Sequence, residues 1–280
     1  MSTFTETGLK KNILKAIEEL GFVEPTPIQE LTIPHLLQNE NDLVALAQTG
    51  TGKTAAFGLP IIDQIDLNSR NTQALILCPT RELCVQITND ITSFSKYTAK
   101  LEQLAVYGGA SIETQIRALK HGCQIVVGTP GRVNDLIRRK VLKLANIRWL
   151  VLDEADEMLN MGFKDELDTI LAETPKEKQT LLFSATMPNE IAQIASKYMN
   201  NPEEISVGKK NAGAENVEHD YYVANAKDRY EVLKRLADMH PKIYAIVFCR
   251  TRRETTEVAD KLINDGYNAD ALHGDLSQAQ

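Results

Sequence analysis

The sequence lacks the features that mark membrane-bound and disulfide-stabilised proteins. Its 280 residues contain no apolar run of about 18 residues, the length that a membrane-spanning helix needs. The first residues, MSTFTETGLKK, have no apolar core of a secretion signal. The four cysteines, Cys78, Cys84, Cys123 and Cys249, form no CxxC pair. We therefore expect a soluble, cytoplasmic protein with no membrane contact, no disulfide and no structural zinc.

An excess of positive charge is also missing. There are 31 Lys and Arg residues against 38 Asp and Glu, which gives a net charge of −7. This balance argues against a protein that binds polyanions through a bulk positive field, but it leaves room for a local cationic groove. Hydrophobic residues at 43% and charged residues at 25% are ordinary for a globular chain, and the length suits about two domains.

Short apolar runs alternate with amphipathic segments along the first two hundred residues. This alternation is typical of an α/β fold in which helices flank both faces of a parallel sheet. The predicted strands are Leu43–Ala47, Ala74–Cys78, Leu104–Tyr107, Gln124–Val127, Trp149–Leu152 and Thr180–Phe183.

The pattern changes after Tyr198. Residues 208–216, GKKNAGAEN, are polar and predict a linker between a first domain, 1–207, and a second, 217–280. The second part is small for an α/β domain, and we expect it to be incomplete. Its predicted elements are strands at Tyr221–Val223, Ile243–Phe248 and Ala269–Leu272, and helices at Asp228–Met239 and Arg253–Ile263.

A glycine-rich loop joins the first predicted strand to a helix. Residues 47–54, AQTGTGKT, follow the strand directly, which is the context of a phosphate-binding P-loop. Its glycines allow backbone N–H groups to point at phosphate oxygens. We expect Lys53 to reach the β- and γ-phosphates and Thr54 to ligate Mg²⁺. The predicted nucleotide-binding residues of the loop are Thr49, Gly50, Thr51, Gly52, Lys53 and Thr54.

Two adjacent carboxylates follow another apolar strand. Asp153 and Glu154 come directly after Trp149–Leu152, and carboxylates at the tip of a buried strand are costly unless a cation compensates them. We expect Asp153 to hold Mg²⁺ through water, and Glu154 to polarise the attacking water. Together with Lys53 they predict a catalytic site for nucleotide hydrolysis.

Ordered motifs along the chain carry a resemblance to a known family. Residues 153–156 spell DEAD, and 21–29, GFVEPTPIQ, resemble a Q motif, with Phe4 upstream. The segments PTREL (79–83), GG (108–109), TPGR (129–132), SAT (184–186), VFCRT (247–251) and HGD (273–275) follow in the family's order. The chain thus resembles the DEAD-box ATP-dependent RNA helicases of superfamily 2. The resemblance implies a RecA-like P-loop NTPase domain, with its Q motif at 4–29, and the start of a second RecA-like domain.

The resemblance implies further contacts to ATP. Phe22 would stack on adenine, and the Gln29 amide would pair with the adenine edge, since a carboxamide offers one donor and one acceptor. Thr26 is placed in the same nucleotide site. Ser184 and Thr186 would hydrogen-bond Asp156 and couple the nucleotide state to domain closure.

The resemblance also implies contacts to RNA. The candidate residues follow predicted strands, where ligands bind in open α/β sheets. Helix N-termini and a few arginines hold phosphates without reading bases, so binding would be independent of sequence. The candidates are Pro79, Thr80, Arg81, Gly109, Thr129, Pro130, Gly131, Arg132, Arg250, Thr251 and Gly274.

These features predict an RNA-dependent ATPase that locally unwinds short duplexes, acting as a monomer with ATP and Mg²⁺ as cofactors. Two alternatives are an ATP-gated RNA clamp or scaffold, whose output is binding, and a DNA-directed helicase. The family's later arginine-bearing motifs do not occur before Gln280. Because an arginine finger contributes about 10³–10⁵ in rate, we expect the 280-residue chain alone to hydrolyse ATP poorly.

Overall fold

The computed structural model describes residues 3–207 and 218–277. Contacts divide the chain into two compact units, Met1–Gly213 and Ala214–Gln280, and each is described by itself. The predicted linker at 208–216 lies outside the described residues. No helix in the described ranges is long and apolar enough to cross a membrane.

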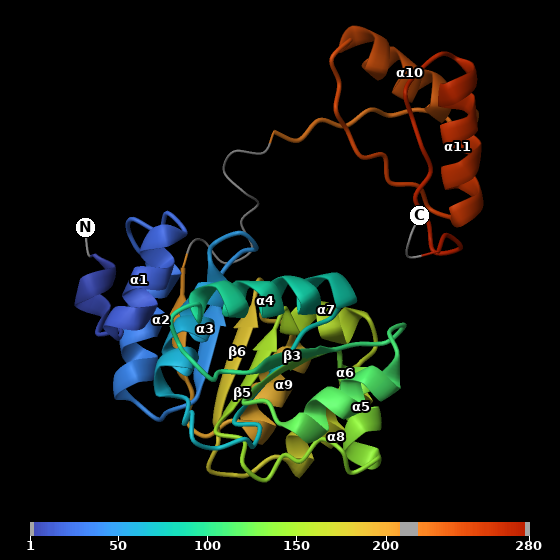
Figure 1. The fold of residues 1–280 in the computed structure, drawn as a ribbon. Coiled ribbons are helices and arrows are strands. Elements are labelled where there is room, and N and C mark those ends of the chain that lie inside the picture. The colour runs from blue at the N-terminus through green and yellow to red at the C-terminus, as the bar shows by residue number, and fades with distance from the viewer. Residues whose placement is uncertain (1–2, 208–217, 278–280) are drawn as a thin grey trace. The chain divides into compact units, whose positions relative to one another are not determined.

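Seven strands form one parallel sheet in the first unit, in the order β3-β4-β2-β5-β6-β1-β7 (Figure 1). Because all neighbours run parallel, their carboxyl ends meet along one edge of the sheet. The strands are β1 Leu43–Leu46, β2 Ala74–Leu77, β3 Gln103–Val106, β4 Ile125–Gly128, β5 Trp149–Asp153, β6 Gln179–Ser184 and β7 Glu203–Ser206.

Helices cover both faces of this sheet, so most strands are apolar throughout. In β1, Leu43 and Ala45 belong to one core cluster, whereas Val44 and Leu46 belong to the other. The first cluster lies beneath the 3₁₀ helix η1 Phe4–Thr7 and α1 Lys11–Glu19, α2 Pro27–Gln38, α3 Lys53–Gln64 and α4 Arg81–Phe94. The second lies beneath α5 Ile112–His121, α6 Pro130–Arg138, α7 Ala155–Asn160, α8 Lys164–Glu173 and α9 Asn189–Tyr198.

The six strands predicted in this unit are confirmed, with no end shifted by more than one residue. The sequence pattern missed β7, which pairs with β1 at the edge of the sheet. Only Ile205 of β7 is buried, while Glu203, Glu204 and Ser206 are exposed. Such a strand carries too few apolar residues to show a period.

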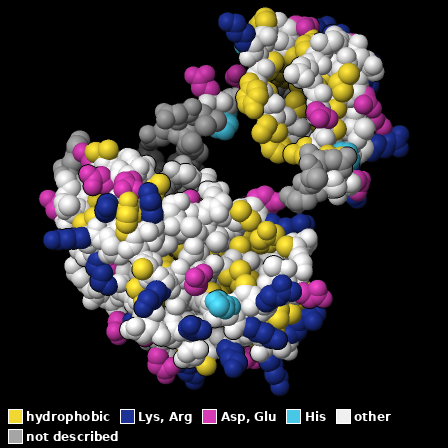
Figure 2. All heavy atoms as spheres, viewed as in Figure 1, with side chains coloured by type: hydrophobic (Ala, Val, Ile, Leu, Met, Phe, Trp, Pro, Cys, Tyr) yellow, Lys and Arg dark blue, Asp and Glu magenta, His cyan; other side chains and the backbone are white. Residues whose placement is uncertain are grey.

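The second unit contains helices but no strand among residues 218–277. The predicted helices are confirmed as α10 Arg229–Met239 and α11 Arg252–Asn264, preceded by the short 3₁₀ helix η2 Ala226–Asp228. The strands predicted at Tyr221–Val223, Ile243–Phe248 and Ala269–Leu272 are wrong. A strand needs a hydrogen-bonded neighbour, and apolar side chains in these segments are exposed instead, with Phe248 at 92%. Figure 2 shows apolar side chains gathered on the surface of this unit.

The tryptophan and the cysteines, which can serve as fluorescent and chemical probes, differ in exposure between the two units. Trp149, the one tryptophan, is buried in β5. Cys78, Cys84 and Cys123 are buried in the first unit, whereas Cys249 in the second is half-buried. A hydrogen bond with Cys84, together with burial, raises the pKa of the Cys78 thiol well above its usual range. Burial raises the pKa of Cys123 to about 11. Thiols of this kind stay protonated and unreactive at neutral pH.

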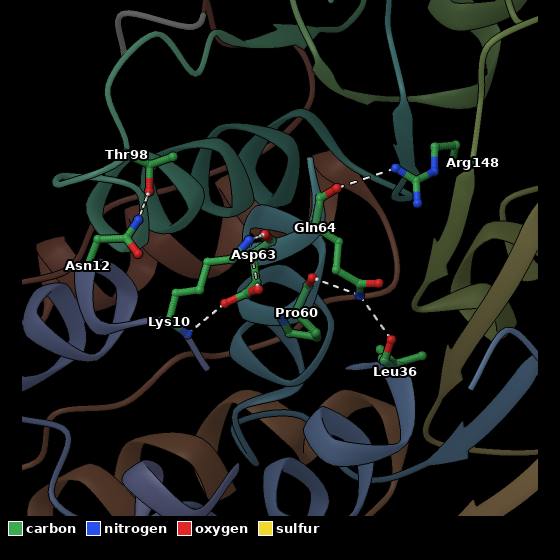
Figure 3. A network of polar contacts seen from close by, with 8 residues as sticks. All are labelled: Lys10, Asn12, Leu36, Pro60, Asp63, Gln64, Thr98 and Arg148. Atoms are coloured by element: carbon green, nitrogen blue, oxygen red, sulfur yellow. Dashed lines mark hydrogen bonds and ion pairs between the residues drawn. The ribbon is translucent and has the colours of Figure 1, made fainter. Parts of the chain in front are cut away.

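A polar network at the end of α3 fixes the N-terminal helices to the sheet (Figure 3). The backbone N–H of Lys10 donates to Asp63 Oδ2 at 2.7 Å, and Lys10 Nζ lies 3.2 Å from Asp63 Oδ1. Gln64 Nε2 donates to the carbonyl of Leu36 at 2.9 Å, at the end of α2. Arg148 Nη1 donates to the Gln64 carbonyl at 3.3 Å. The carboxyl end of α3 is thus attached to α1, α2 and the start of β5.

Replacing Asp63 should loosen this attachment. Asp63→Ala leaves the Lys10 N–H without its acceptor, so we expect a loss of about 1–3 kcal/mol in the unfolding free energy of the first unit. Trp149 fluorescence during urea unfolding reports on that unit alone. Asp63→Asn, which keeps an acceptor oxygen, should lose less. An Asp63→Ala curve that superimposes on the wild type would contradict a stabilising role.

Candidate functional site

The predicted P-loop connects β1 to α3 at the carboxyl edge of the sheet. Gly50 and Gly52 have φ angles of +77° and +85°, a left-handed region that favours glycine. A Cβ on Gly52 would lie 2.3 Å from Gln29 Nε2, so a larger residue would displace Gln29. The conformation and the close approach together require glycine at position 52.

Lys53 begins α3 and lies across this loop. Its side chain is buried, at 7% exposure, and its Nζ donates to the Ala47 carbonyl at 3.2 Å. An ammonium group has three donors, so further N–H groups remain for an anion. Lys53 forms no ion pair with a carboxylate in the described part of the chain. Burial of an unpaired ammonium group costs free energy, and a bound phosphate would compensate its charge.

Asp153 and Glu154 lie at the end of β5, on the same edge as the P-loop. Burial raises the pKa of Asp153 to about 6, although the positive charge of Lys53 acts in the opposite direction. The Glu154 N–H donates to Asp153 Oδ1 at 3.1 Å. Glu154 itself has φ +52° and ψ +51°, a left-handed conformation that costs a non-glycine residue about 1–3 kcal/mol. Strain of this kind is typical of functional positions.

The residues present suit Mg²⁺ in the company of phosphates. Asp153 offers carboxylate oxygens and the half-buried Thr54 a hydroxyl, and Mg²⁺ prefers such oxygen ligands. Within residues 3–207 and 218–277, no cluster of three His, Cys, Asp or Glu is placed to hold a metal. The remaining ligands would have to be phosphate oxygens and water, so cation binding would depend on the nucleotide.

Thr26 and Gln29 attach the predicted Q motif to the P-loop. Thr26 Oγ1 donates to the Thr51 carbonyl at 2.8 Å, and Gln29 Nε2 donates to the Gly52 carbonyl at 3.1 Å. Gln29 Oε1 accepts from the Thr26 N–H at 3.0 Å. The Gln29 amide is expected to pair with the adenine edge, and in the structure each of its polar atoms already has one partner within the chain. A carboxamide retains a second donor and a second acceptor position for a base.

A cleft of about 550 Å³ extends from these groups. Phe22 lines it, and the Phe22 ring lies 6.0 Å from both Phe4 and Phe94, between centroids. The cleft also contains residues that sequence reasoning missed, all on one side of α4: Leu83, Gln86, Asp90, Ser93 and Phe94. Their spacing repeats at the helical period, which indicates from the sequence that they share one face of a helix. The sequence does not show that this face lines a cleft.

Asp156 connects the DEAD segment to the end of β6. Thr186 donates to Asp156 Oδ2 from its hydroxyl at 2.7 Å and from its N–H at 3.1 Å. Ser184, expected to share this role, differs: its Oγ is buried and has no hydrogen-bond partner among the described residues. Ser184 is buried at the end of β6, whereas Thr186 lies beyond it in an exposed loop.

The RNA candidates of the first unit lie at the ends of β2, β3 and β4, on the same edge. Thr80 caps α4 by accepting the Leu83 N–H at 3.2 Å. Arg81 is exposed beside Gly109, where a Cβ would lie 2.2 Å from Arg81 Nη1. At the start of α6, Thr129 and Pro130 are buried and Gly131 is exposed; Pro79 is buried after β2.

Arg132 is largely engaged within the chain. Its Nη1 donates to Gln115 Oε1 at 2.8 Å, and both terminal nitrogens donate to the Ala110 carbonyl, at 3.2 and 3.3 Å. Arg132 therefore positions the loop after β3, next to Gly109.

The remaining three candidates belong to the second unit. Arg250 pairs with Glu254, with Nε 3.2 Å from Oε2. Thr251 caps α11 by accepting the Glu254 N–H at 3.1 Å. Gly274 has no atom near the place of a Cβ. These residues surround the start of α11 and its neighbouring loop.

The sheet order, the strand–loop–helix at 43–64 and the acidic end of β5 define a P-loop nucleotide-binding protein of RecA-like α/β fold. Residues 26–194 match the DEAD/DEAH box helicase family. The chain therefore belongs to that family, which confirms the resemblance of its motifs.

Individual relatives agree with this assignment. The chain is 51% identical to the ATP-dependent RNA helicase CshA of Listeria monocytogenes, over its whole length and 54% of the relative. It is 48% identical to the CshA of Geobacillus kaustophilus, again over its whole length and 60% of the relative. A crystal structure of a DEAD box protein from Methanococcus jannaschii matches 99% of this chain and 74% of its own, with a TM-score of 0.71 and 47% identity. The chain spans about half the length of the curated relatives it matches.

Removing the Lys53 ammonium tests the phosphate site. Because Lys53 is the buried cation of the loop, Lys53→Ala should abolish binding of Mg·ATP, measured by calorimetry. Lys11→Ala, which removes an exposed lysine of α1, should leave the affinity unchanged. An unchanged affinity in Lys53→Ala would contradict the assignment of the P-loop.

Proposed function

We propose that this chain is the nucleotide- and RNA-binding part of an ATP-dependent RNA helicase. One observation carries the proposal: the P-loop, the acidic end of β5 and the loops after β2, β3 and β4 lie along one edge of one sheet. In open α/β sheets, ligands bind outside the carboxyl ends of the strands. The two CshA relatives named above are ATP-dependent RNA helicases, which supports RNA as the polymer.

The ATP part of the proposal assigns a role to each residue of the edge. The P-loop N–H groups and Lys53 bind the phosphates, and Phe22, Thr26 and Gln29 bind the nucleoside. Thr54 would hold Mg²⁺ directly and Asp153 would hold it through water, and the cation would neutralise charge on the phosphates. Glu154 orients and deprotonates the attacking water, as a general base does.

The RNA part rests on backbone contacts. The N-termini of α4 and α6 present N–H groups, and Arg81 adds a positive charge, so they suit phosphates and leave the bases unread. Arg250, Thr251 and Gly274 would bind the same strand from the second unit. Thr186 and Asp156 would pass the state of the nucleotide to the RNA-binding loops, and closure of the two units on RNA would bend it and separate a short duplex locally.

The full-length protein provides the test. ATP hydrolysis should rise with RNA of any sequence and much less with DNA, and ATP should drive release of a strand from a short RNA duplex. Equal stimulation by DNA would favour the DNA-directed alternative. ATP-dependent RNA binding without strand release would favour a clamp.

The Glu154→Gln variant separates nucleotide binding from hydrolysis. It keeps the size of the side chain and removes the base, so ATP binding should persist while RNA-stimulated hydrolysis falls by about 10²–10⁴ in the full-length protein. Calorimetry measures the first quantity and phosphate release the second. Wild-type turnover would remove Glu154 from this role.

A further inference from the structure

One side of α4 forms a wall of the nucleotide cleft. Leu83, Gln86, Asp90 and Ser93 line it, and they recur every three or four residues, so they share one face of the helix. The neighbouring face, with Cys84, Ile87 and Ile91, is buried in the core. The packing of α4 on its apolar face thus directs a carboxylate, Asp90, into the cleft.

Asp90 has no partner that explains its position. It is half-buried, and this burial raises its pKa. Among the residues that the structure describes, no side chain or backbone group forms a hydrogen bond or an ion pair with the Asp90 carboxylate, and burial alone acts on its pKa. An exposed acid on an amphipathic helix would need no partner, but a partly desolvated one is unfavourable until a donor reaches it.

The place of Asp90 along α4 indicates which part of a nucleotide it meets. Phe94, one turn further along, packs against Phe22 at the aromatic end of the cleft. Leu83 lies at the start of α4, which follows β2, the neighbour of β5 with Asp153. At 1.5 Å per residue, Asp90 is about 6 Å from the level of Phe94 and about 10 Å from that of Leu83. It therefore lies between the base end and the phosphate end of the cleft, where the sugar of a nucleotide would lie.

We infer that Asp90 accepts hydrogen bonds from the ribose hydroxyls of the bound nucleotide and makes the site selective for ribonucleotides. A carboxylate is an acceptor only, and the 2′- and 3′-hydroxyls are donors. An acidic residue that accepts from ribose hydroxyls is a known solution in other α/β nucleotide sites. The inference rests on the proposed function, because it assumes that ATP occupies this cleft.

Calorimetry with two nucleotides tests the inference on this chain. The wild type should bind Mg·ATP about tenfold more tightly than Mg·2′,3′-dideoxy-ATP, the fold-change expected for a hydrogen bond to a charged acceptor. Asp90→Ala should weaken ATP binding by about tenfold and leave dideoxy-ATP binding unchanged, so the preference disappears. Asn89→Ala, an exposed neighbour on α4 of similar size, should retain it.

The possible outcomes separate this inference from the proposed function. An equal loss for both nucleotides in Asp90→Ala would overturn the ribose contact, since it would place the effect elsewhere, for example on the adenine amino group. Equal wild-type affinities for both nucleotides, with binding still dependent on Lys53, would overturn the ribose contact alone. Failure of the wild type to bind ATP would overturn both. Circular dichroism of Asp90→Ala, compared with Asn89→Ala, shows whether α4 is intact.

Discussion

The parallel pairing of the strands is the constraint on which the site depends. Because β2, β4, β5, β6 and β1 run in one direction, residues far apart in sequence meet along one edge. The P-loop and the DEAD segment are about a hundred residues apart in the chain, yet Lys53 lies close enough to Asp153 to affect its pKa. A single antiparallel strand among these would send its loop to the other edge and separate the groups.

Two kinds of contact hold this edge in a shape that is unfavourable by itself. Gly52 and Glu154 both have a left-handed backbone conformation. Glycine adopts it without strain, whereas glutamate does not. Hydrogen bonds from Thr26 and Gln29 to P-loop carbonyls hold the loop around Gly52. At Glu154, the backbone N–H donates to Asp153 Oδ1. The Q motif is therefore part of the support of the loop, in addition to any contact with the base.

Local patterns predicted much of this architecture, and tertiary contacts account for the rest. An apolar run predicts the strand before the P-loop, and the glycines with Lys53 predict the helix after it. The predicted end of that strand differs from the end of β1 by one residue. In contrast, Ile243–Phe248 is apolar enough for a strand, but pairing requires a distant neighbour that local sequence does not reveal. Other features depend on packing between elements, which no single segment encodes. They are the hydrogen bond from Gln29 to the P-loop, the lack of a partner for the Ser184 hydroxyl among the described residues, and the side of α4 that faces the cleft.

The positions of the tryptophan and of one cysteine allow the distance between the two units to be followed by energy transfer. Trp149 is the one tryptophan and lies in the first unit, while Cys249, in the second, is the cysteine that the interior does not enclose. A thiol-reactive acceptor dye would therefore attach to the second unit, with the indole as its donor in the first. Energy transfer between them would report any change in the separation of the two units of this chain, without a substitution.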